Sequence, residues 1–242
     1  MLRSGSLRQL ILPCLAVLTI ACGGGSGSPT AGSGDIVPAA PPPPPVAAMA
    51  ATYRVTFDAA WSRASHPTDF PDNPHFSGLI GATHLGSTRF WDAGAIATDG
   101  IKAMAERGRK SPLDREIENA IANGQAEHLL SGGPIGRSPG GMTLDFEVGV
   151  DQPFVTLVAM VAPSPDWFVG VSALSLLENG DWTQLLEVEL FGYDAGTDAG
   201  RTFTSLNQPQ SPRVPISRIE SGPLIQGSNG APLGTFTFRR LS

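Results

Sequence analysis

The chain has 242 residues, of which 29 are glycine, 22 are proline and only 16% are charged. This composition is typical of short strands separated by tight turns, and it disfavours a helical bundle. The formal net charge of −6 argues against sequence-independent nucleic-acid binding and against electrostatic docking on anionic lipid, because both need a basic surface. We therefore expect no nucleic-acid partner.

The N-terminus resembles a bacterial lipoprotein signal. A short basic region at residues 1–8 precedes an apolar run at 10–20 that is too short to span a bilayer as a stable helix. Cleavage after Ala21 would expose Cys22 for acylation, and no Asp follows Cys22, which favours the outer membrane. We predict a signal peptide over residues 1–21 and a membrane anchor through lipid on Cys22, in a protein of the bacterial cell envelope. The alternative is an ordinary secretory signal with an incidental cysteine, which would give a secreted protein.

Residues 22–51 form a predicted tether between this signal and a folded domain at 52–242. The segment consists mostly of Gly, Ser, Ala and Pro, with five consecutive prolines at 41–45. Such a composition cannot form a core, and it is typical of a spacer that is flexible in its Gly/Ser part and semi-rigid in its Pro run. Cys14 and Cys22 are the only cysteines, so the domain is expected to fold without a disulfide.

The folded domain begins with a strand pattern. Tyr53, Val55 and Phe57 alternate with polar residues, as in a half-buried strand. Leu186, Val188 and Leu190 alternate with glutamates in the same way, whereas residues 154–161 are continuously apolar, as in a strand buried on both faces. Together with further segments these patterns predict an all-β sandwich. The further strands are expected at 142–149, 167–171 and 236–238, with short pieces at 88–91 and 201–204 and an edge at 207–216.

Two helices are expected between residues 99 and 130. Residues 101–107 are followed by Gly108, a typical left-handed helix end. In the second helix Ser111 is the expected cap, Pro112 the first helical residue and Gly124 the C-terminal cap. We expect this small helical insertion to cover an edge or an end of the sandwich.

Three aspartates stand in two loops that follow apolar segments. Asp166 lies in a Pro-rich loop, and Asp194 and Asp198 lie in a Gly-rich loop. If both loops emerge at the same end of the sandwich, the three carboxylates come together, and oxygen ligands without sulfur are those that Ca²⁺ prefers. The alternative is that Asp194 and Asp198 only cap turns.

Three histidines in the loops before residue 85 raise a separate metal hypothesis. His66, His75 and His84 could bind zinc, but no cysteine accompanies them and their spacing is not that of a helix-borne site. We favour hydrogen bonding within loops.

The two aspartate loops also carry a family resemblance. Ala-Pro-Ser-Pro-Asp-Trp-Phe-Val-Gly at 162–170 and Tyr-Asp-Ala-Gly-Thr-Asp-Ala-Gly at 193–200 closely resemble the spondin domain, the module named after F-spondin. The resemblance extends over roughly residues 53–241, including His-Pro-Thr-Asp-Phe-Pro at 66–71 and Lys-Ser-Pro-Leu-Asp at 110–114.

This resemblance implies a C2-like β-sandwich with a calcium ion held by Asp166, Asp194 and Asp198. Animal spondin domains carry disulfides that this chain cannot form, and the chain lacks the thrombospondin-type repeats that accompany them. The matrix partners of the animal proteins are therefore not carried over.

These observations predict a non-enzymatic, Ca²⁺-binding adhesion or binding module that contacts a protein or polysaccharide through its loops. The alternative is a metal-dependent or carboxylate-based hydrolase of the cell envelope. A third possibility is a structural envelope protein in which calcium only stabilises the fold.

Overall fold

Strand β1 (Ala50–Ala59) lies inside the first of two β-sheets. Its odd-numbered residues from Ala51 to Ala59 are all buried, as the alternation predicted, and the strand starts two residues before the expected boundary at Thr52. The computed structural model describes residues 48–242. The strands of this antiparallel sheet are, in order, β10 (Leu185–Leu190), β13 (Gly234–Arg240), β1 and β5 (Gly140–Gly149).

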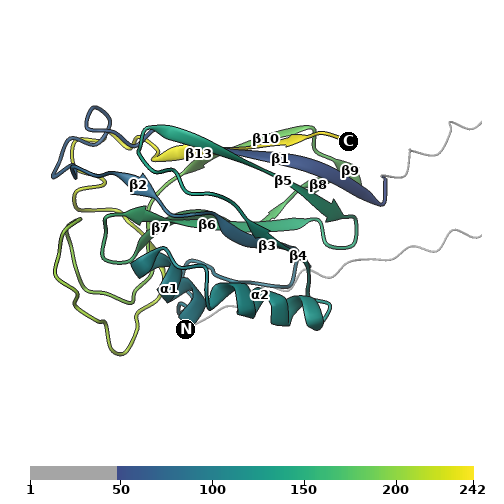
Figure 1. The fold of residues 1–242 in the computed structure, drawn as a ribbon, viewed down its shortest axis with the longest axis horizontal. Coiled ribbons are helices and arrows are strands. Elements are labelled where there is room, and N and C mark those ends of the chain that lie inside the picture. Colours follow the sequence, from purple (N-terminus) through teal and green to yellow (C-terminus); the bar gives the residue numbers. More distant parts are fainter. Residues whose placement is uncertain (1–47) are drawn as a thin grey trace, which may run out of the picture. The chain divides into compact units, whose positions relative to one another are not determined.

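The second sheet packs beneath the first (Figure 1). Its strands are, in order, β12 (Ser217–Arg218), β11 (Tyr193–Asp194), β7 (Trp167–Ser175), β6 (Phe154–Ala162), β3 (Ile80–His84) and β4 (Ala126–Ser131), with β2 (His75–Phe76) pairing with β6 off this path. A separate hairpin joins β8 (Leu177–Glu178) to β9 (Asp181–Trp182) through Asn179 and Gly180, which both have positive φ. Every strand pair described is antiparallel, which confirms the predicted all-β sandwich with a small helical insertion.

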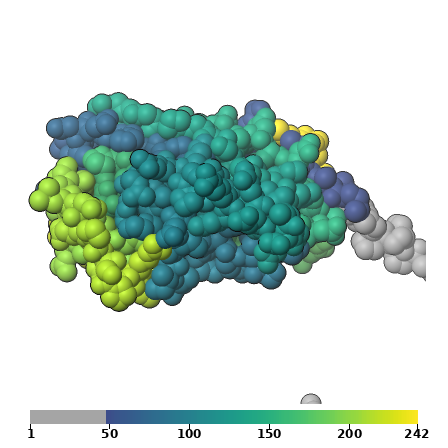
Figure 2. All heavy atoms as spheres, turned by 60° about the horizontal axis from the view of Figure 1, so that its bottom comes forward, coloured from purple at the N-terminus to yellow at the C-terminus, as the bar shows by residue number. Residues whose placement is uncertain are grey.

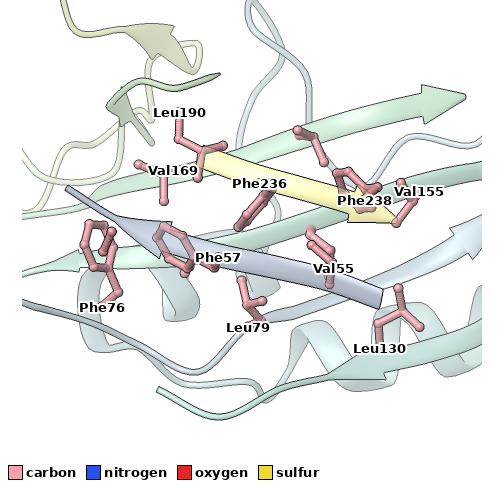
Figure 3. Packing of buried hydrophobic residues seen from close by; sticks show 14 of the residues in the cluster. Val55, Phe57, Phe76, Leu79, Leu130, Val155, Val169, Leu190, Phe236 and Phe238 are labelled. Carbon is pink, nitrogen blue, oxygen red and sulfur yellow. The ribbon is translucent and has the colours of Figure 1, made fainter. Parts of the chain in front are cut away.

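Aromatic and aliphatic side chains from the two sheets meet in the main core. Phe236 and Phe238 of β13 and Phe57 of β1 point toward the second sheet (Figure 3) and are at most 1% exposed. Burying one such side chain contributes about 1.5–3 kcal/mol. Since the described part of the chain has no cysteine, this core is the main source of its stability.

The two helices cover the outer face of the second sheet. Helices α1 (Asp99–Arg107) and α2 (Leu113–Ala122) lie over that face (Figures 1 and 2). Their buried residues form a second cluster with Ile80, Val158 and Phe168 of the sheet. The expectation that the insertion covers an edge or an end is therefore only partly met: α2 packs on the edge strand β4, but the helices also cover the sheet face over β3 and β6. Because β6 is apolar on both faces, as predicted, its outer face needs a cover of its own.

The ends of the helices agree only in part with the prediction. Gly108 directly follows α1 with a φ of 62°, and Gly124 follows Asn123, the cap residue of α2, with a φ of 70°, so both glycines adopt the expected left-handed conformation. Ser111 does not cap α2, which begins at Leu113 without a side-chain cap. Instead Glu116 of α2 accepts a hydrogen bond from the Gly100 N–H at 2.7 Å, so this carboxylate satisfies a free donor at the start of α1.

Several short strands were predicted wrongly. Residues 88–91 form no strand, because Phe90 and Trp91 turn into the cluster beneath the helices. Residues 201–204 form a turn, and the segment 207–216 contributes only isolated bridges at Pro209 and Pro215. Strand β4, by contrast, was not predicted.

Candidate metal centre

The short strand β11 brings the two aspartate loops together. Asp194 lies opposite Trp167, the first residue of β7, and the turn between β6 and β7 carries Asp166 directly before it. Asp198 follows four residues after Asp194, in the loop that connects β11 to β12. Both loops therefore emerge at the same end of the sandwich, which is the condition on which the metal hypothesis depends.

Asp166 is completely buried, and its two carboxylate oxygens have different surroundings. Oδ2 accepts hydrogen bonds from the backbone N–H groups of Thr197 and Asp198, at 2.7 and 3.0 Å, and from the Thr197 hydroxyl at 3.1 Å. Oδ1 has no hydrogen-bond partner. A buried carboxylate oxygen without a donor is costly, because it loses its hydration and gains no bond in return.

The other two aspartates bond to the backbone of their own loop. Asp194 Oδ1 accepts from the Gly196 N–H at 2.7 Å, and Asp198 accepts from the Gly200 N–H at 2.8 Å and the Gln208 N–H at 2.9 Å. These bonds are those that the turn-capping interpretation predicted. They also orient the carboxylates, so turn capping and ion binding are compatible.

Gly196 is required by the shape of this loop. Its φ is +70°, and a Cβ atom placed on it would lie 2.1 Å from the carbonyl oxygen of Val214. Only glycine adopts this conformation at so close an approach without strain. The Asp-Ala-Gly-Thr-Asp motif thus has its glycine where the chain turns back to present the N–H groups of Thr197 and Asp198 to Asp166.

The electrostatics of the cluster disfavour three ionised carboxylates. Burial, reinforced by the nearby charge of Asp194, raises the pKa of Asp166 from 3.8 to about 6 despite its three hydrogen bonds. Burial also raises the pKa of Asp194, and the charge of Asp198 adds to that effect. The cluster therefore holds negative charge that a bound cation would offset.

The side chains alone do not complete a metal site. Within residues 48–242, no three His, Cys, Asp or Glu side chains converge closely enough to hold an ion by themselves. The three aspartates offer only oxygen ligands, and one of these oxygens, Asp166 Oδ1, is buried without a hydrogen-bond partner. Such a set fits a hard cation that also takes backbone carbonyls and water as ligands.

A comparison with known families bears on this arrangement. Residues 51–228, which include both aspartate loops, match the model of the family described as Spondin_N. The chain belongs to the Spondin_N family. The resemblance predicted from the two motifs is thereby confirmed.

Relatives of this Spondin_N chain are similar over most of its length. It is 33% identical to Spondin-2 of Rattus norvegicus over 195 residues, which is 79% of this chain and 58% of the relative. It is 32% identical to Spondin-2 of Homo sapiens over 231 residues, 94% of this chain and 66% of the relative. Spondin-1 of Gallus gallus is 33% identical over 183 residues, 71% of this chain but 22% of the relative. The chain thus spans between about a fifth and two thirds of these relatives.

The histidines of the Spondin_N domain lie in separate places. His84 is buried and its Nε2 lies 2.8 Å from the Thr156 hydroxyl oxygen, whereas His66 contacts the Ser65 hydroxyl and His75 the Asn73 carbonyl. Hydrogen bonding within loops is therefore confirmed for His66, and His75 bonds locally to the loop before β2, whereas His84 is the last residue of β3 and contacts Thr156 of β6.

The structure adds one feature to the site that the sequence did not suggest. A pocket beside Asp194 is lined by Arg201 and by Ser217, Arg218 and Glu220 of the β12 region. Asp194, Arg201 and the segment 217–220 are separated along the chain and form no sequence motif. The pocket becomes visible only because β11 pairs with β12 and so places Asp194 opposite Ser217.

The predicted signal peptide and the lipidation residue Cys22 lie outside the described residues. Within residues 48–242, neither helix has the length and apolarity needed to cross a bilayer.

Proposed function

We propose that this chain is a non-enzymatic, extracellular binding module whose loop end is ordered by a bound Ca²⁺ ion. The observation that carries the proposal is the fully buried Oδ1 of Asp166, which has no hydrogen-bond partner and belongs to a loop paired with the loop of Asp194 and Asp198. A hard divalent cation is the ligand that such an oxygen prefers.

Asp166, Asp194 and Asp198 would hold this ion. Its charge would offset the carboxylates and favour the ionised form of each. Because Asp166 comes from one loop and the two others from the second loop, the ion would fix the loops relative to each other. A ligand that binds only the folded protein also stabilises it.

Membership in the Spondin_N family supports an adhesion or binding role with a protein or polysaccharide partner at the ordered loops. We propose that the chain carries out this role at the bacterial surface or in the periplasm, held to the outer membrane by lipid on Cys22 or else secreted.

Burial argues against the carboxylate-based hydrolase. A general acid or nucleophile must come within hydrogen-bond reach of its substrate. Asp166 is 0% exposed and its free oxygen is also buried, and Asp198 is only 4% exposed. Neither carboxylate is placed to reach a glycoside or ester.

Isothermal titration calorimetry of the chelated protein tests the calcium proposal. We expect Ca²⁺ to bind with a dissociation constant on the order of 10⁻⁴–10⁻³ M, the range of extracellular calcium modules, and Mg²⁺ to bind more weakly. Asp194→Asn should weaken Ca²⁺ binding at least tenfold, whereas Asp151→Asn, at an exposed site away from the cluster, should not. Equal Ca²⁺ affinity of both variants would place the ion elsewhere, and no binding by the unmodified protein would leave the aspartates as turn caps only.

A further inference from the structure

Strand β5 forms an open edge of the first sheet. It has 10 residues and pairs with β1 along its whole length, and among the strands described no other pairs with it. Strands are most often about five or six residues long, so this edge is a long one. An open edge presents unpaired N–H and C=O groups to which another extended chain can bind.

Hydrogen bonds at the end of β5 show which of its residues face this edge. The Val150 N–H donates to the Met49 carbonyl oxygen at 2.8 Å, in the register of the β1–β5 ladder. The Gly149 N–H points the other way and donates to Glu127 Oε2 at 3.0 Å. Because the backbone groups of successive residues alternate between the two edges of a strand, the odd-numbered residues of β5 direct theirs away from β1. Those before Gly149 are all exposed, and they are Gly141, Thr143, Asp145 and Glu147.

The inner side of this edge is apolar. A pocket of about 400 Å³ lies between β5 and β4, which is the edge strand of the second sheet. Among the residues that line it, Leu130 and Phe146 belong to the core between the sheets and Leu144 packs against that core. A strand added about 4.8 Å from β5 would direct every second side chain toward this pocket. Apolar side chains fit those positions.

The outer side of the same edge is acidic. Asp145 and Glu147 have their side chains on the outer face of the sheet, since Phe146 between them is buried in the core. Asp145 pairs with Arg54 at 2.6 Å, but Glu147 takes part in none of the ion pairs within residues 48–242. A basic residue directly opposite Glu147 on an added strand would therefore be stabilising.

Charge selects against a second copy of this chain at the edge. Antiparallel pairing of β5 with itself would gather Asp145 and Glu147 of both copies on one face of the joined sheet, where like charges are destabilising. A segment with basic residues at alternate positions would meet the same face with the opposite charge. Charge complementarity therefore favours a basic partner.

We propose that the open edge of β5 binds an extended basic segment of a partner protein as a fifth, antiparallel strand of this sheet. Its basic residues lie beside Asp145 and Glu147, and the residues between them are apolar and face Leu144. Main-chain hydrogen bonds supply affinity in this mode of binding, and the alternating side chains supply specificity. The proposal goes beyond the function proposed above, because the metal centre lies in loops of the second sheet and β5 belongs to the first.

Calorimetric peptide titrations of the purified full-length protein test this inference. The probe is the capped peptide Lys-Val-Lys-Val-Lys-Val-Lys. One control, Glu-Val-Glu-Val-Glu-Val-Glu, reverses the charge, and the other, Lys-Lys-Lys-Val-Val-Val-Lys, keeps the composition but loses the alternation. The alternating basic peptide should bind at least tenfold more tightly than either control. Equal binding of either control, or no binding of the alternating basic peptide, would overturn the proposal.

N-methylated versions of the basic peptide test the main-chain pairing. In an antiparallel pair, directly opposite residues place their side chains on the same face, so the lysine amides are those that bond to β5. N-methylation of the lysine amides should weaken binding at least tenfold, and N-methylation of the valine amides is the matched control that should weaken it little. Unchanged affinity of the lysine-methylated peptide would overturn strand addition.

Charge-reversal variants locate the edge. Glu147→Lys should weaken binding of the alternating basic peptide at least tenfold. Glu187→Lys, the same change at an exposed position on β10, the other edge of this sheet, should leave it unchanged. The opposite result would place the added strand on β10, and either that result or unchanged affinity in both variants would overturn the assignment to β5.

Titrations in chelator separate this proposal from the calcium proposal. The peptide should bind equally well with and without Ca²⁺, because none of the three aspartates of the metal centre lies on β5. Peptide binding by a protein that fails to bind Ca²⁺ would refute only the metal centre, and Ca²⁺ binding without peptide binding would refute only the added strand. Peptide binding that requires Ca²⁺ would place the peptide at the aspartate loops and overturn the inference.

Discussion

Replacement of Asp166 by Asn should stabilise the metal-free protein at neutral pH. The folded-state pKa of Asp166 is about 6, against an ordinary value of 3.8. The folded protein therefore binds this proton more tightly than the unfolded chain does. Below pH 3.8 the shift has no effect on stability, between pH 3.8 and 6 stability falls as pH rises, and above pH 6 the full penalty remains.

The magnitude follows from the size of the shift. About two pKa units at 1.36 kcal/mol each correspond to a penalty of about 3 kcal/mol at pH 7. Asparagine has nearly the same shape, carries no charge and keeps one oxygen acceptor for the N–H groups of Thr197 and Asp198. Because hydrogen bonds to a charged acceptor are stronger than those to a neutral one, 3 kcal/mol is an upper bound on the gain. For a domain of this size it corresponds to a rise in Tm of about 6–12 °C.

Thermal melts in chelator at pH 4.5 and pH 7, and at pH 7 with added Ca²⁺, check this prediction. The Asn variant should be more stable than the unmodified protein at pH 7 in chelator, and the difference should shrink at pH 4.5. Ca²⁺ at about 100 times its Kd should stabilise the unmodified protein by about 2.7 kcal/mol and the variant by much less. Asp151→Asn serves as the control, because Asp151 is exposed. If metal-free Asp166→Asn is less stable at pH 7, the lost charged hydrogen bonds outweigh the relief of burial and the reasoning is wrong.

Three further substitutions probe the fold in urea titrations. Gly196→Ala should lower the free energy of unfolding by about 2 kcal/mol or more, since it combines a positive φ with a Cβ only 2.1 Å from a carbonyl oxygen. The control Gly133→Ala has open space around its new Cβ and should change the free energy of unfolding little. Equal losses in the two variants would contradict the argument. Thr156→Val should cost about 1–3 kcal/mol, because its hydroxyl oxygen contacts both His84 and the Ala173 N–H; an unchanged unfolding midpoint would mean that water replaces these bonds. Phe236→Ala should cost about 3–5 kcal/mol at its fully buried position, and a loss below 1 kcal/mol would show that the core collapses around the gap.

Local hydrophobic patterns predicted the strands whose burial is either strictly alternating or continuous. The alternation at Tyr53, Val55 and Phe57 follows β1, and the continuous apolar run follows β6. Strand β4 was missed because its burial does not alternate: it lies at an edge beside the helices, and its residues are buried only where a neighbour covers them. The position of the helices on a sheet face could not be predicted either, because the sequence shows an apolar helix side without showing its partner.

The candidate site was predictable only in its residue types. The two motifs pointed to Asp166, Asp194 and Asp198, and the structure brings their loops to one end. Sequence could not show that one oxygen of Asp166 is satisfied by the Asp194–Asp198 loop while the other is left free. That difference depends on long-range backbone placement.

Strand β6 contributes to both clusters: Leu157, Ala159 and Val161 belong to the core between the sheets, and Val158 and Met160 belong to the cluster under the helices. The core between the sheets and the cluster under the helices therefore share one strand, and neither can unfold without exposing apolar surface of the other. We expect unfolding in a single cooperative step. A version shortened by removal of residues 99–122 would leave Ile80, Val158 and Phe168 facing water, and it would aggregate instead of yielding a smaller sandwich.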